Sequence, residues 1–452
     1  MKIVVFDDDP TGSQTVHGCP LLLKWDQSSL SDAIRHPSPL IFLLANTRSM
    51  PPDLAAIRTH DICKSVAKAL RSERFGLDNI LFVSRGDSTL RGHGVLEPEV
   101  INEVLGPFDA TLHVPAFIEG GRTTINGVHL LNGSPVHTTP FAQDKTFGYS
   151  TSDLDLWLEE KSRGAILARN VHRLTIHSLE AAFDSKSGMN SLVDWLSDLS
   201  GNKPVVVDAE LPIHLDVLGK AIRRLLGRKR FLFRSAASFI NGLANLPSNC
   251  YQPKDLVALR LKAGPGDLKP GLVMVGSYVP LADEQLEILL QNHSCVGIEL
   301  PVKKILLALQ GSLSDLIFSE MKNEWLDRLN HILASKKTPV LYSSRGELQF
   351  ESAQERINFG NGLASLMASL VAKVSSQLGY VITKGGITSH AFLEKGLKLT
   401  SVQLKGQLLP GLSLVCADTY LPAQGLPIVT FPGNLGQKET LSLAWRLMED
   451  AN

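Results

Sequence analysis

Three successive carboxylates near the amino terminus are the first candidates for chemistry. Asp7, Asp8 and Asp9 follow an apolar run at residues 3–6 and precede Pro10-Thr11-Gly12. The β-branched and aromatic run predicts a buried strand, and the ligands of open α/β sheets bind at the carboxyl ends of strands. Adjacent carboxylates disfavour one another's ionised form unless a cation, a sugar hydroxyl or a basic partner offsets the repulsion. We therefore predict a binding site, with a solvated acidic turn capped by Asp9 as the alternative.

The first half of the chain contains further polar residues that suit a small, oxygen-rich anion. Each lies just past an apolar run or in a long polar loop after residue 114, and the set comprises Asn46, Arg48, Asp87, Ser88, Arg91 and Arg122. Guanidinium groups bind carboxylates through two parallel hydrogen bonds, while Asp and Asn side chains orient hydroxyls. With Asp8 and Asp9, this set predicts a site for a polyhydroxy acid. A charged surface rim would use the same residue types and is the alternative.

The second half contains two glycine-containing turns, at residues 384–388 and 432–436, each after an apolar run and before a helical pattern. Glycine lets the backbone approach a ligand closely, and free N–H groups at a helix start attract phosphate. Two such turns predict a nucleotide site, although each one alone fits plain turn geometry. The sequence has neither a Walker A loop nor a complete G-x-G-x-x-G, so it does not match a P-loop or Rossmann fingerprint.

Apolar runs alternate with amphipathic helical patterns along the chain, which is typical of parallel sheets covered by helices on both faces. Strands are predicted at residues 3–6, 39–45, 79–83, 110–114, 165–168, 205–207, 231–233, 272–275, 296–300, 340–342, 380–383 and 428–431. Helices are predicted from about residue 52, at 95–105, at about 353–378 and at the carboxyl end. Prolines and glycines at residues 246–271 favour a linker. We predict an α/β protein of two domains, residues 1–246 and 272–452, joined by a linker at 247–271, each a mostly parallel sheet flanked by helices, with the active site in the cleft between them.

The composition limits the classes of partner. The 452 residues carry 45 basic and 45 acidic side chains, so no overall field attracts nucleic acid or anionic lipid. We expect no signal peptide and no membrane span. The cysteines are scattered without a Cys-x-x-Cys pair, which predicts buried thiols in a reducing cytoplasm, and they are Cys19, Cys63, Cys250, Cys295 and Cys416. The histidines show no metal-ligand spacing, so we predict no transition-metal site, and the sequence leaves homo-oligomer formation open.

As an ordered set, the motifs resemble those of the four-carbon acid sugar kinase family. They are Asp8-Asp9-x-Thr11-Gly12, Asn46-Thr47-Arg48-Ser49, Asp87-Ser88-Thr89-x-Arg91-Gly92, Pro115-Ala116-Phe117 with Gly121-Arg122, Gly276-Ser277, Lys384-Gly385-Gly386-Ile387-Thr388-Ser389 and Pro432-Gly433-Asn434-Leu435-Gly436. The resemblance covers nearly the whole chain. It implies an amino-terminal sugar-acid-binding domain and a carboxyl-terminal nucleotide-binding domain. The implied reaction transfers the ATP γ-phosphate to a hydroxyl of a substrate such as a 3-oxo-tetronate or threonate.

The resemblance also implies roles for individual residues. The residues that would face the sugar acid are Asp8, Asp9, Arg48, Asp87, Ser88 and Arg91, and the residue pattern adds Arg122. The residues that would contact ATP are Ser277, Gly385, Gly386, Ile387, Thr388, Gly433 and Asn434. We predict in-line phosphoryl transfer in which Asp9 or Asp8 accepts or orients the hydroxyl proton. Mg²⁺, held mainly by phosphate oxygens and water, would stabilise the transferring phosphate. Asp7 has no predicted role in the transfer and serves as the control for substitutions of Asp8 and Asp9.

Two other classes of protein are alternatives. Residues 4–11 also satisfy the strand and Asp-x-Asp-x-Thr signature of haloacid-dehalogenase-type phosphohydrolases, with Asp7 as nucleophile and Asp9 as acid. The later acidic motif of that class is absent, because Gly86-Asp87 is followed four positions on by Arg91. A non-enzymatic sugar-acid-binding protein is the second alternative, although such proteins are usually exported.

Overall fold

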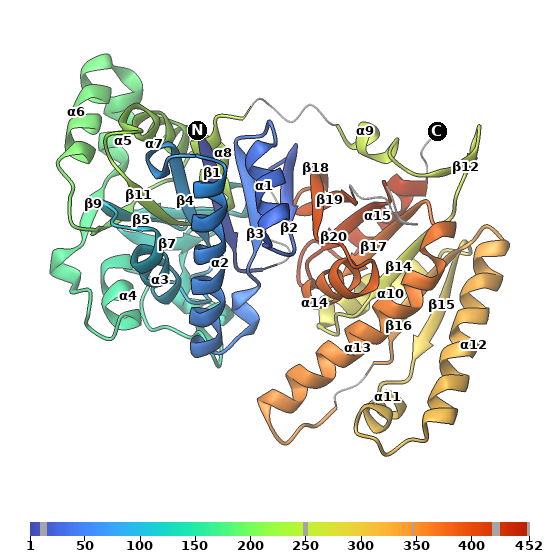
Figure 1. The fold of residues 1–452 in the computed structure, drawn as a ribbon. Coiled ribbons are helices and arrows are strands. Elements are labelled where there is room, and N and C mark those ends of the chain that lie inside the picture. Colours follow the sequence, from blue (N-terminus) through green and yellow to red (C-terminus); the bar gives the residue numbers. More distant parts are fainter. Residues whose placement is uncertain (10–15, 247–251, 346–347, 418–424, 450–452) are drawn as a thin grey trace. The chain divides into compact units, whose positions relative to one another are not determined.

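The computed structural model describes residues 1–9, 16–246, 252–345, 348–417 and 425–449 (Figure 1). Packing divides the chain into two units, Met1–Ser248 and Asn249–Asn452. Pro10, Thr11 and Gly12 of the first motif lie outside the described residues, as do Cys250 and the rest of residues 247–251 of the predicted linker.

The first unit is built on a parallel sheet with the strand order β2, β3, β1, β4, β11, β5, β10 and β9. The strands are β1 Lys2–Asp7, β2 Cys19–Leu22, β3 Leu40–Leu44, β4 Ile80–Arg85, β5 Ala110–Val114, β9 His172–Leu174, β10 Lys203–Val207 and β11 Phe231–Ser235. Every residue of β1, β3, β4, β5 and β11 is buried. Burial on both faces is expected where helices cover a parallel sheet on both sides.

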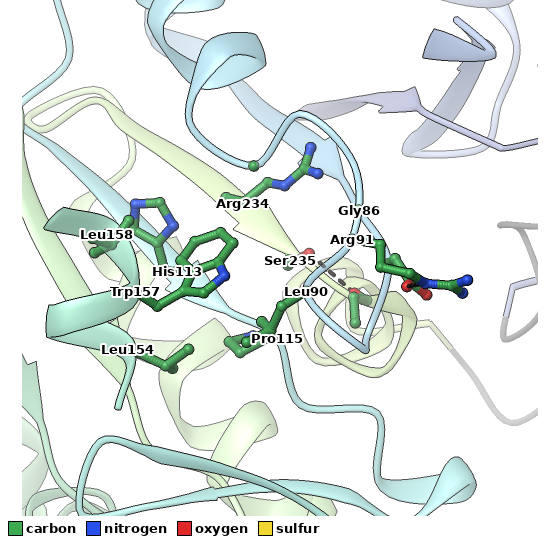
Figure 2. Close-up of a pocket in the computed structure, with 13 residues that line it drawn as sticks. Gly86, Leu90, Arg91, His113, Pro115, Leu154, Trp157, Leu158, Arg234 and Ser235 are labelled. Atoms are coloured by element: carbon green, nitrogen blue, oxygen red, sulfur yellow. Dashed lines mark hydrogen bonds and ion pairs between the residues drawn. The ribbon is translucent and has the colours of Figure 1, made fainter. Parts of the chain in front are cut away.

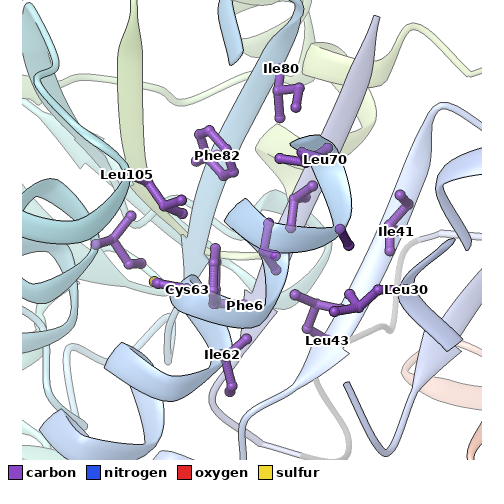
Figure 3. Packing of buried hydrophobic residues seen from close by; sticks show 14 of the residues in the cluster. Phe6, Leu30, Ile41, Leu43, Ile62, Cys63, Leu70, Ile80, Phe82 and Leu105 are labelled. Atoms are coloured by element: carbon purple, nitrogen blue, oxygen red, sulfur yellow. The ribbon is translucent and has the colours of Figure 1, made fainter. Parts of the chain in front are cut away.

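Helices pack against this sheet and form its core. They are α1 Gln27–Arg35, α2 Pro52–Ser72, α3 Leu96–Leu105, α4 Leu154–Lys161, α5 Ile176–Asp184, α6 Lys186–Ser197, α7 Pro212–Leu225 and α8 Ala237–Ala244. The first three bury apolar side chains against the central strands, with Phe6, Ile62 and Phe82 in one cluster (Figure 3). Asp26 caps the start of α1 by accepting a hydrogen bond from the Ser29 amide at 3.1 Å.

A small antiparallel sheet follows β5 in the first unit. Its strands are β6 Arg122–Ile125, β7 Val128–Leu131 and β8 Ser134–Pro135, and a 3₁₀ turn at Ile118–Gly120 precedes it. The sequence predicts a long polar loop here. Arg122 instead begins a strand, which fixes its backbone more firmly than a loop would.

The second unit contains a mostly parallel sheet with the order β15, β16, β14, β17, β20, β19 and β18. The strands are β14 Gly271–Val275, β15 Cys295–Leu300, β16 Thr338–Ser343, β17 Tyr380–Lys384, β18 Ser401–Leu409, β19 Leu412–Ala417 and β20 Pro427–Phe431. Strands β14, β15, β16, β17 and β20 are parallel, while β19 is antiparallel to both β18 and β20.

Helices of the second unit flank its sheet. They are α9 Pro253–Val257, α10 Pro280–Leu290, α11 Val302–Leu309, α12 Asp315–Ala334, α13 Ala353–Val374, α14 Gly386–Ala391 and α15 Thr440–Glu449. Leu289 of α10 and Leu441 and Trp445 of α15 pack with Val273 and Ile382 of the central strands. Among the described residues, no helix is both long and apolar enough to cross a membrane.

Most predicted strands are confirmed, but the strand predicted at 165–168 is wrong. Residues 168–170 form a 3₁₀ turn, and the strand lies at β9. Arg163 and Gly164 take positive φ angles of 53° and 84° and turn the chain after α4, so Ile166 packs against a small cluster around Trp157 rather than in the sheet. The β2 strand and the β18–β19 pair were not predicted.

The segment 252–271, predicted as the end of a linker, contains ordered structure within the second unit. It includes α9 and a short hairpin, β12 Lys262–Gly264 and β13 Asp267–Leu268. Leu256 and Val257 of α9 join the core of the second unit. The guanidinium of Arg260 pairs with the Glu449 carboxylate at 3.0 Å, which ties this segment to α15.

Candidate active site

The strand register of the first unit brings its candidate residues to one edge of the sheet. Asp7 at the end of β1 is in register with Leu44 of β3 and Arg85 of β4. The residues that follow these three strands therefore lie close together. The Arg48 amide donates to the Asp8 carbonyl at 3.1 Å, which locks the turn after β3 onto the end of β1.

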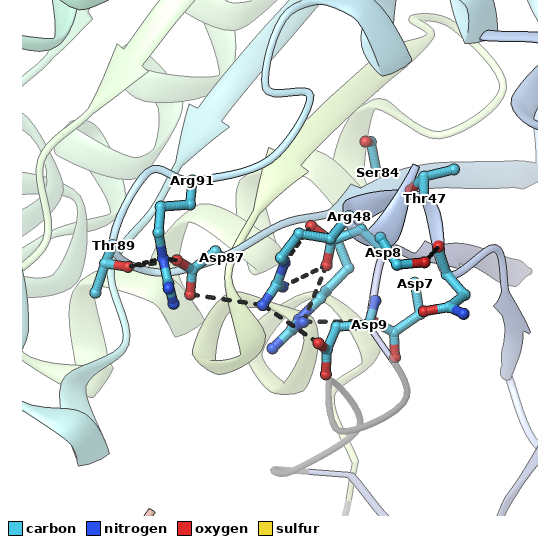
Figure 4. Close-up of polar contacts among 12 residues, drawn as sticks. Asp7, Asp8, Asp9, Thr47, Arg48, Ser84, Asp87, Thr89 and Arg91 are labelled. Carbon is cyan, nitrogen blue, oxygen red and sulfur yellow. Dashed lines mark hydrogen bonds and ion pairs between the residues drawn. The ribbon is translucent and has the colours of Figure 1, made fainter. Parts of the chain in front are cut away.

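Asp8 is the centre of an arginine cluster (Figure 4). Arg48 binds both of its carboxylate oxygens, with Nη2 2.6 Å from Oδ1 and Nε 3.1 Å from Oδ2. The Nη1 of Arg85 lies 3.2 Å from Oδ1, and the Nη2 of Arg234 lies 3.9 Å from Oδ2. The Asp8 side chain is 1% exposed. Because the Asp8 carboxylate is buried among three guanidinium groups, it is better suited to positioning those arginines than to accepting a proton.

Asp9 has a more open environment. Its side chain is 24% exposed, and Oδ2 lies 3.5 Å from Nη1 of Arg48. Asp7, in contrast, is 1% exposed and lies 3.4 Å from Nη1 of Arg85. Burial raises the Asp7 pKa to about 7, although the charge of Arg85 opposes the shift. Of the three acids, Asp9 therefore has the most exposed carboxylate.

Asp87 forms the second centre of the cluster. Its Oδ2 accepts from Nε of Arg91 at 2.7 Å and from the Thr89 hydroxyl, and its Oδ1 lies 4.0 Å from Nη1 of Arg48. Burial favours the neutral acid, but the two guanidinium charges outweigh it and hold the pKa of Asp87 below its ordinary value. Asp87 is therefore a carboxylate at neutral pH, held between Arg48 and Arg91.

Ser88 and Arg122 complete the predicted sugar-acid set. The Ser88 carbonyl accepts a hydrogen bond from the His129 ring at 2.7 Å, which fixes the loop after β4. Arg122 donates through Nη1 to the Gly120 carbonyl, while its buried Nε has no hydrogen-bond partner among the described residues. Burial lowers the Arg122 pKa, and the nearby Asp87 charge opposes this shift without cancelling it. Arg122 thus lies near enough to Asp87 and Arg91 for their charges to act on it, and its buried Nε is an additional hydrogen-bond donor there.

Three residues that the sequence patterns did not identify hold this site together. Arg234 in β11 pairs with Glu97 of α3, and both are buried. Glu97 also accepts from the Ser84 hydroxyl at 3.1 Å. Arg85, at the end of β4, approaches both Asp7 and Asp8. A charged residue inside an apolar strand pattern, such as Arg234 in Phe-Leu-Phe-Arg-Ser, is the pattern that could have revealed this support.

The second unit brings together loops that follow three neighbouring strands, β14, β17 and β20. The Gly276 and Ser277 amides donate to the Lys384 carbonyl at 3.1 and 3.3 Å, and the Gly385 amide donates to the Phe431 carbonyl at 2.8 Å. Gly385 has a φ of +115°, which favours glycine. A Cβ on Gly433 would lie 2.8 Å from the Ser277 hydroxyl oxygen, so these two loops meet closely.

The predicted nucleotide residues differ in what they can offer. Thr388 is buried against Gly276, where an added Cβ would lie 2.0 Å from its Oγ1. Gly386 is half-buried, whereas Ile387 and Asn434 are exposed. None of the predicted nucleotide residues has a charged side chain, so a phosphate held by this group would be held by uncharged donors such as backbone amides.

Lys384 and Arg345 flank this glycine cluster. The Lys384 ammonium is fully buried, donates to the Pro432 carbonyl at 2.9 Å and lies 3.7 Å from the centre of the Phe431 ring. Its burial lowers the Lys384 pKa to about 7. Arg345, which follows β16 and was not predicted, donates to the Ser277 carbonyl at 2.7 Å. The polar Ser343-Ser344-Arg345 run after a predicted strand follows the rule applied in the first half.

No group of three or more His, Cys, Asp or Glu side chains in the described part of the chain is arranged to hold a metal ion. The four cysteines that the structure describes, Cys19, Cys63, Cys295 and Cys416, are all buried.

Comparison with known proteins assigns a role to each unit. Residues 3–243 match the family model of a sugar-binding N-terminal domain, and residues 272–441 match that of a nucleotide-binding C-terminal domain. The chain is 23% identical over 428 residues to D-erythronate kinase of Heliobacterium modesticaldum, covering 90% of this chain and 88% of that protein.

Two solved structures share the fold. A Salmonella typhimurium LT2 protein superposes with a TM-score of 0.69 at 17% identity, covering 98% of this chain and 99% of its own. Haemophilus influenzae protein HI1011 superposes with a TM-score of 0.62 at 15% identity, covering 99% and 100%. At these identities the likeness concerns the fold.

The fold and the two matched domains define an α/β protein that binds a sugar in one unit and a nucleotide in the other. The chain belongs to the four-carbon acid sugar kinase family. The fold confirms the predicted α/β class with two domains, and the family assignment confirms the predicted activity, an ATP-dependent sugar-acid kinase.

Proposed function

We propose that the chain transfers the γ-phosphate of ATP to a hydroxyl of erythronate or a closely similar four-carbon sugar acid. The observation that carries the proposal is the arginine–carboxylate cluster around Asp8 and Asp87 in the unit that matches the sugar-binding domain. Guanidinium groups suit the substrate carboxylate and the acids suit its hydroxyls. The D-erythronate kinase relative supports this choice of four-carbon acid.

Asp9 is the proposed general base. Its carboxylate is more exposed than that of Asp8 and lies at the edge of the arginine cluster. It would take the proton of the reacting hydroxyl as the new bond forms between that oxygen and the γ-phosphorus, while the bond to the β-phosphate oxygen breaks and ADP leaves. Asp8 would keep Arg48 in place, and Arg48, Arg91 and Arg122 would orient the acid.

The glycine cluster of the second unit is the proposed nucleotide site. Backbone amides around Gly385 and Gly433, with the Ser277 and Thr388 hydroxyls, would hold the phosphates. Phosphate oxygens and water would hold Mg²⁺, which suits a site without a group of three protein ligands in the described residues and supplies charge neutralisation. In the proposed reaction, the arginine–carboxylate cluster of the first unit binds the phosphate acceptor and the glycine cluster of the second unit binds the phosphate donor.

The residues do not support the phosphohydrolase alternative. Asp7 would be its nucleophile, yet Asp7 is 1% exposed and lies next to Arg85. We propose a cytoplasmic location, where ATP is available and the buried cysteines stay reduced. A homo-oligomer is compatible with this function and is not required by it.

A panel of tetronates tests the proposal. ADP release is measured with the D and L forms of erythronate and threonate and with 3-oxo-tetronates, at fixed ATP and Mg²⁺. We expect one or more of these acids to be phosphorylated, with erythronate among the best substrates. Turnover of none of them, or ATP-independent hydrolysis of a phosphate ester, would contradict the proposal.

A further inference from the structure

A small cavity lies behind the sugar-acid cluster in the first unit (Figure 2). Its volume is about 30 Å³. The lining comes from the carboxyl ends of the neighbouring strands β4, β11 and β5 and from α4, which closes the far side. A water-sized group needs roughly 10–15 Å³, so the cavity accepts the end of a small molecule rather than a whole sugar acid.

The cavity shares lining residues with the site already described. Asp87 and Arg91 line it and also belong to the cluster. Arg234 lines it as well, and its Nη2 lies 3.9 Å from Asp8. A molecule bound between the arginines and Asp9 therefore has room to extend toward α4.

Two buried nitrogens in this wall lack partners. Trp157 is 3% exposed and His113 is 6% exposed. The indole Nε1 of Trp157 and Nδ1 of His113 have no hydrogen-bond partner among the described residues. An indole N–H can only donate, and leaving such a buried donor unpaired costs about 1–3 kcal/mol. The wall thus calls for an oxygen atom that accepts a hydrogen bond.

On the α4 side the lining is apolar, because Leu154 and Leu158 lie beside Trp157. Figure 2 shows His113, Trp157 and Leu158 along one wall, with Arg91 at the opposite rim. The indole ring is pressed against Gly94, where an added Cβ would lie 2.5 Å from its Cη2. Burial lowers the His113 pKa to about 3, so the imidazole is neutral. The far wall therefore has a fixed position and carries no charge.

We infer that this cavity holds one oxygen-bearing end of the sugar acid, that Trp157 donates a hydrogen bond to it, and that Trp157 limits the substrate to four carbons. The inference rests on the proposed function and adds a determinant of chain length. The end that enters is the one remote from the reacting hydroxyl, because Asp9 lies on the other side of the Arg48–Asp87 contact. A five-carbon acid would press its additional carbon against the indole.

Two replacements of Trp157 separate its roles. Trp157→Phe keeps an aromatic wall and removes the N–H, so the KM for the four-carbon acid should rise about 3- to 10-fold with little change in kcat. Trp157→Leu shortens the wall, so the ratio of kcat/KM for five-carbon over four-carbon aldonates should rise at least about tenfold. Trp325, a buried tryptophan of α12 in the second unit, provides matched controls as Trp325→Phe and Trp325→Leu.

The calorimetric unfolding transition of the first unit, which contains Trp157, checks that each Trp157 variant is folded. If Trp157→Leu does not fold, the KM effect of Trp157→Phe still decides. A selectivity ratio and a KM within about twofold of wild type would mean that the cavity holds water only, and the inference would be overturned. If wild-type protein phosphorylates four-carbon acids in that case, the proposed function stands. If the wild-type protein phosphorylates none of the four-carbon acids, both the proposed function and the inference about Trp157 are overturned.

Discussion

Replacing Arg48 by methionine removes the bidentate hydrogen bonds to the Asp8 carboxylate while keeping a side chain of similar length. Arg48 binds the Asp8 carboxylate oxygens at 2.6 and 3.1 Å and lies 3.5 Å from Asp9. After the replacement, Asp8 stays buried with Arg85 at 3.2 Å and Arg234 at 3.9 Å. The change therefore weakens, but does not abolish, the compensation of a buried charge.

The expected loss of stability follows from that remaining compensation. Removing one partner of a buried ion pair costs about 3–5 kcal/mol when the other charge is left alone. Because Arg85 still pairs with Asp8, we expect a loss of about 2–3 kcal/mol. For a unit of this size each kcal/mol lowers Tm by roughly 2–4 °C, so the Tm of the first unit should fall by roughly 4–12 °C.

Calorimetry of the full chain, with and without an ATP analogue, measures this loss. The analogue should raise the transition of the second unit and identify the other transition as that of the first. Arg35→Met is the matched control, because Arg35 pairs with Glu73 at 2.7 Å with its side chain 66% exposed. Because solvent screens such a surface pair, its removal should leave Tm almost unchanged.

Kinetics of the same variant test the role of the cluster in binding. Arg48→Met should raise the KM for the sugar acid at least about tenfold, since it loses a charged hydrogen bond to the ligand. The KM for ATP should stay near the wild-type value. A variant that matches Arg35→Met in both Tm and KM would refute the role assigned to this cluster.

Three further predictions concern the base and the nucleotide site. Asp9→Asn should lower kcat by about 10²- to 10⁴-fold with little change in KM. The kcat of Asp7→Asn should stay within about fivefold of wild type. Equal losses of kcat in the two variants would contradict the assignment of Asp9 as the base. Gly385→Ala places a side chain on a residue with a φ of +115° and should weaken binding of an ATP analogue in calorimetric titration. Gly360→Ala is the control, because an added Cβ there meets open space, and it should leave the affinity unchanged. Equal affinities of the two variants for the analogue would contradict the nucleotide site. Unfolded chains keep the Lys384 proton up to an ordinary pKa of 10.5, while the folded chain releases it near 7, so stability should rise with pH across that window. In urea titrations at pH 7 and 9.5, Lys384→Met should lose that component of the rise, and a wild-type pH dependence in the variant would contradict it.

Sequence patterns predicted much of the fold because the central strands are continuous apolar runs. β1, β3, β4, β14 and β17 bury every residue, so their hydrophobic runs are unmistakable. The prediction at 165–168 failed because Ile166 packs with the cluster around Trp157 of α4 instead of entering the sheet, while Ala165 is exposed. Strand β18 alternates buried and half-buried residues over its whole length, a weaker pattern that marks one covered face.

The candidate site was predictable where polar residues end a strand. Arg48 and Asp87 follow apolar runs, and the parallel register of β1 with β3 and β4 brings their segments together. Which carboxylate is committed to arginines depends on tertiary contacts, and no local pattern distinguishes Asp8 from Asp9. Arg234 lies more than 200 positions from Asp8 in the sequence, so its contact is invisible without the fold.

Phosphorus NMR of a reaction with erythronate, ATP and Mg²⁺ tests the central claim most directly. We predict a new phosphomonoester resonance that grows in proportion to ADP, and its loss in Asp9→Asn. Release of inorganic phosphate without a phosphorylated acid, or undiminished formation of the ester by Asp9→Asn, would contradict the account.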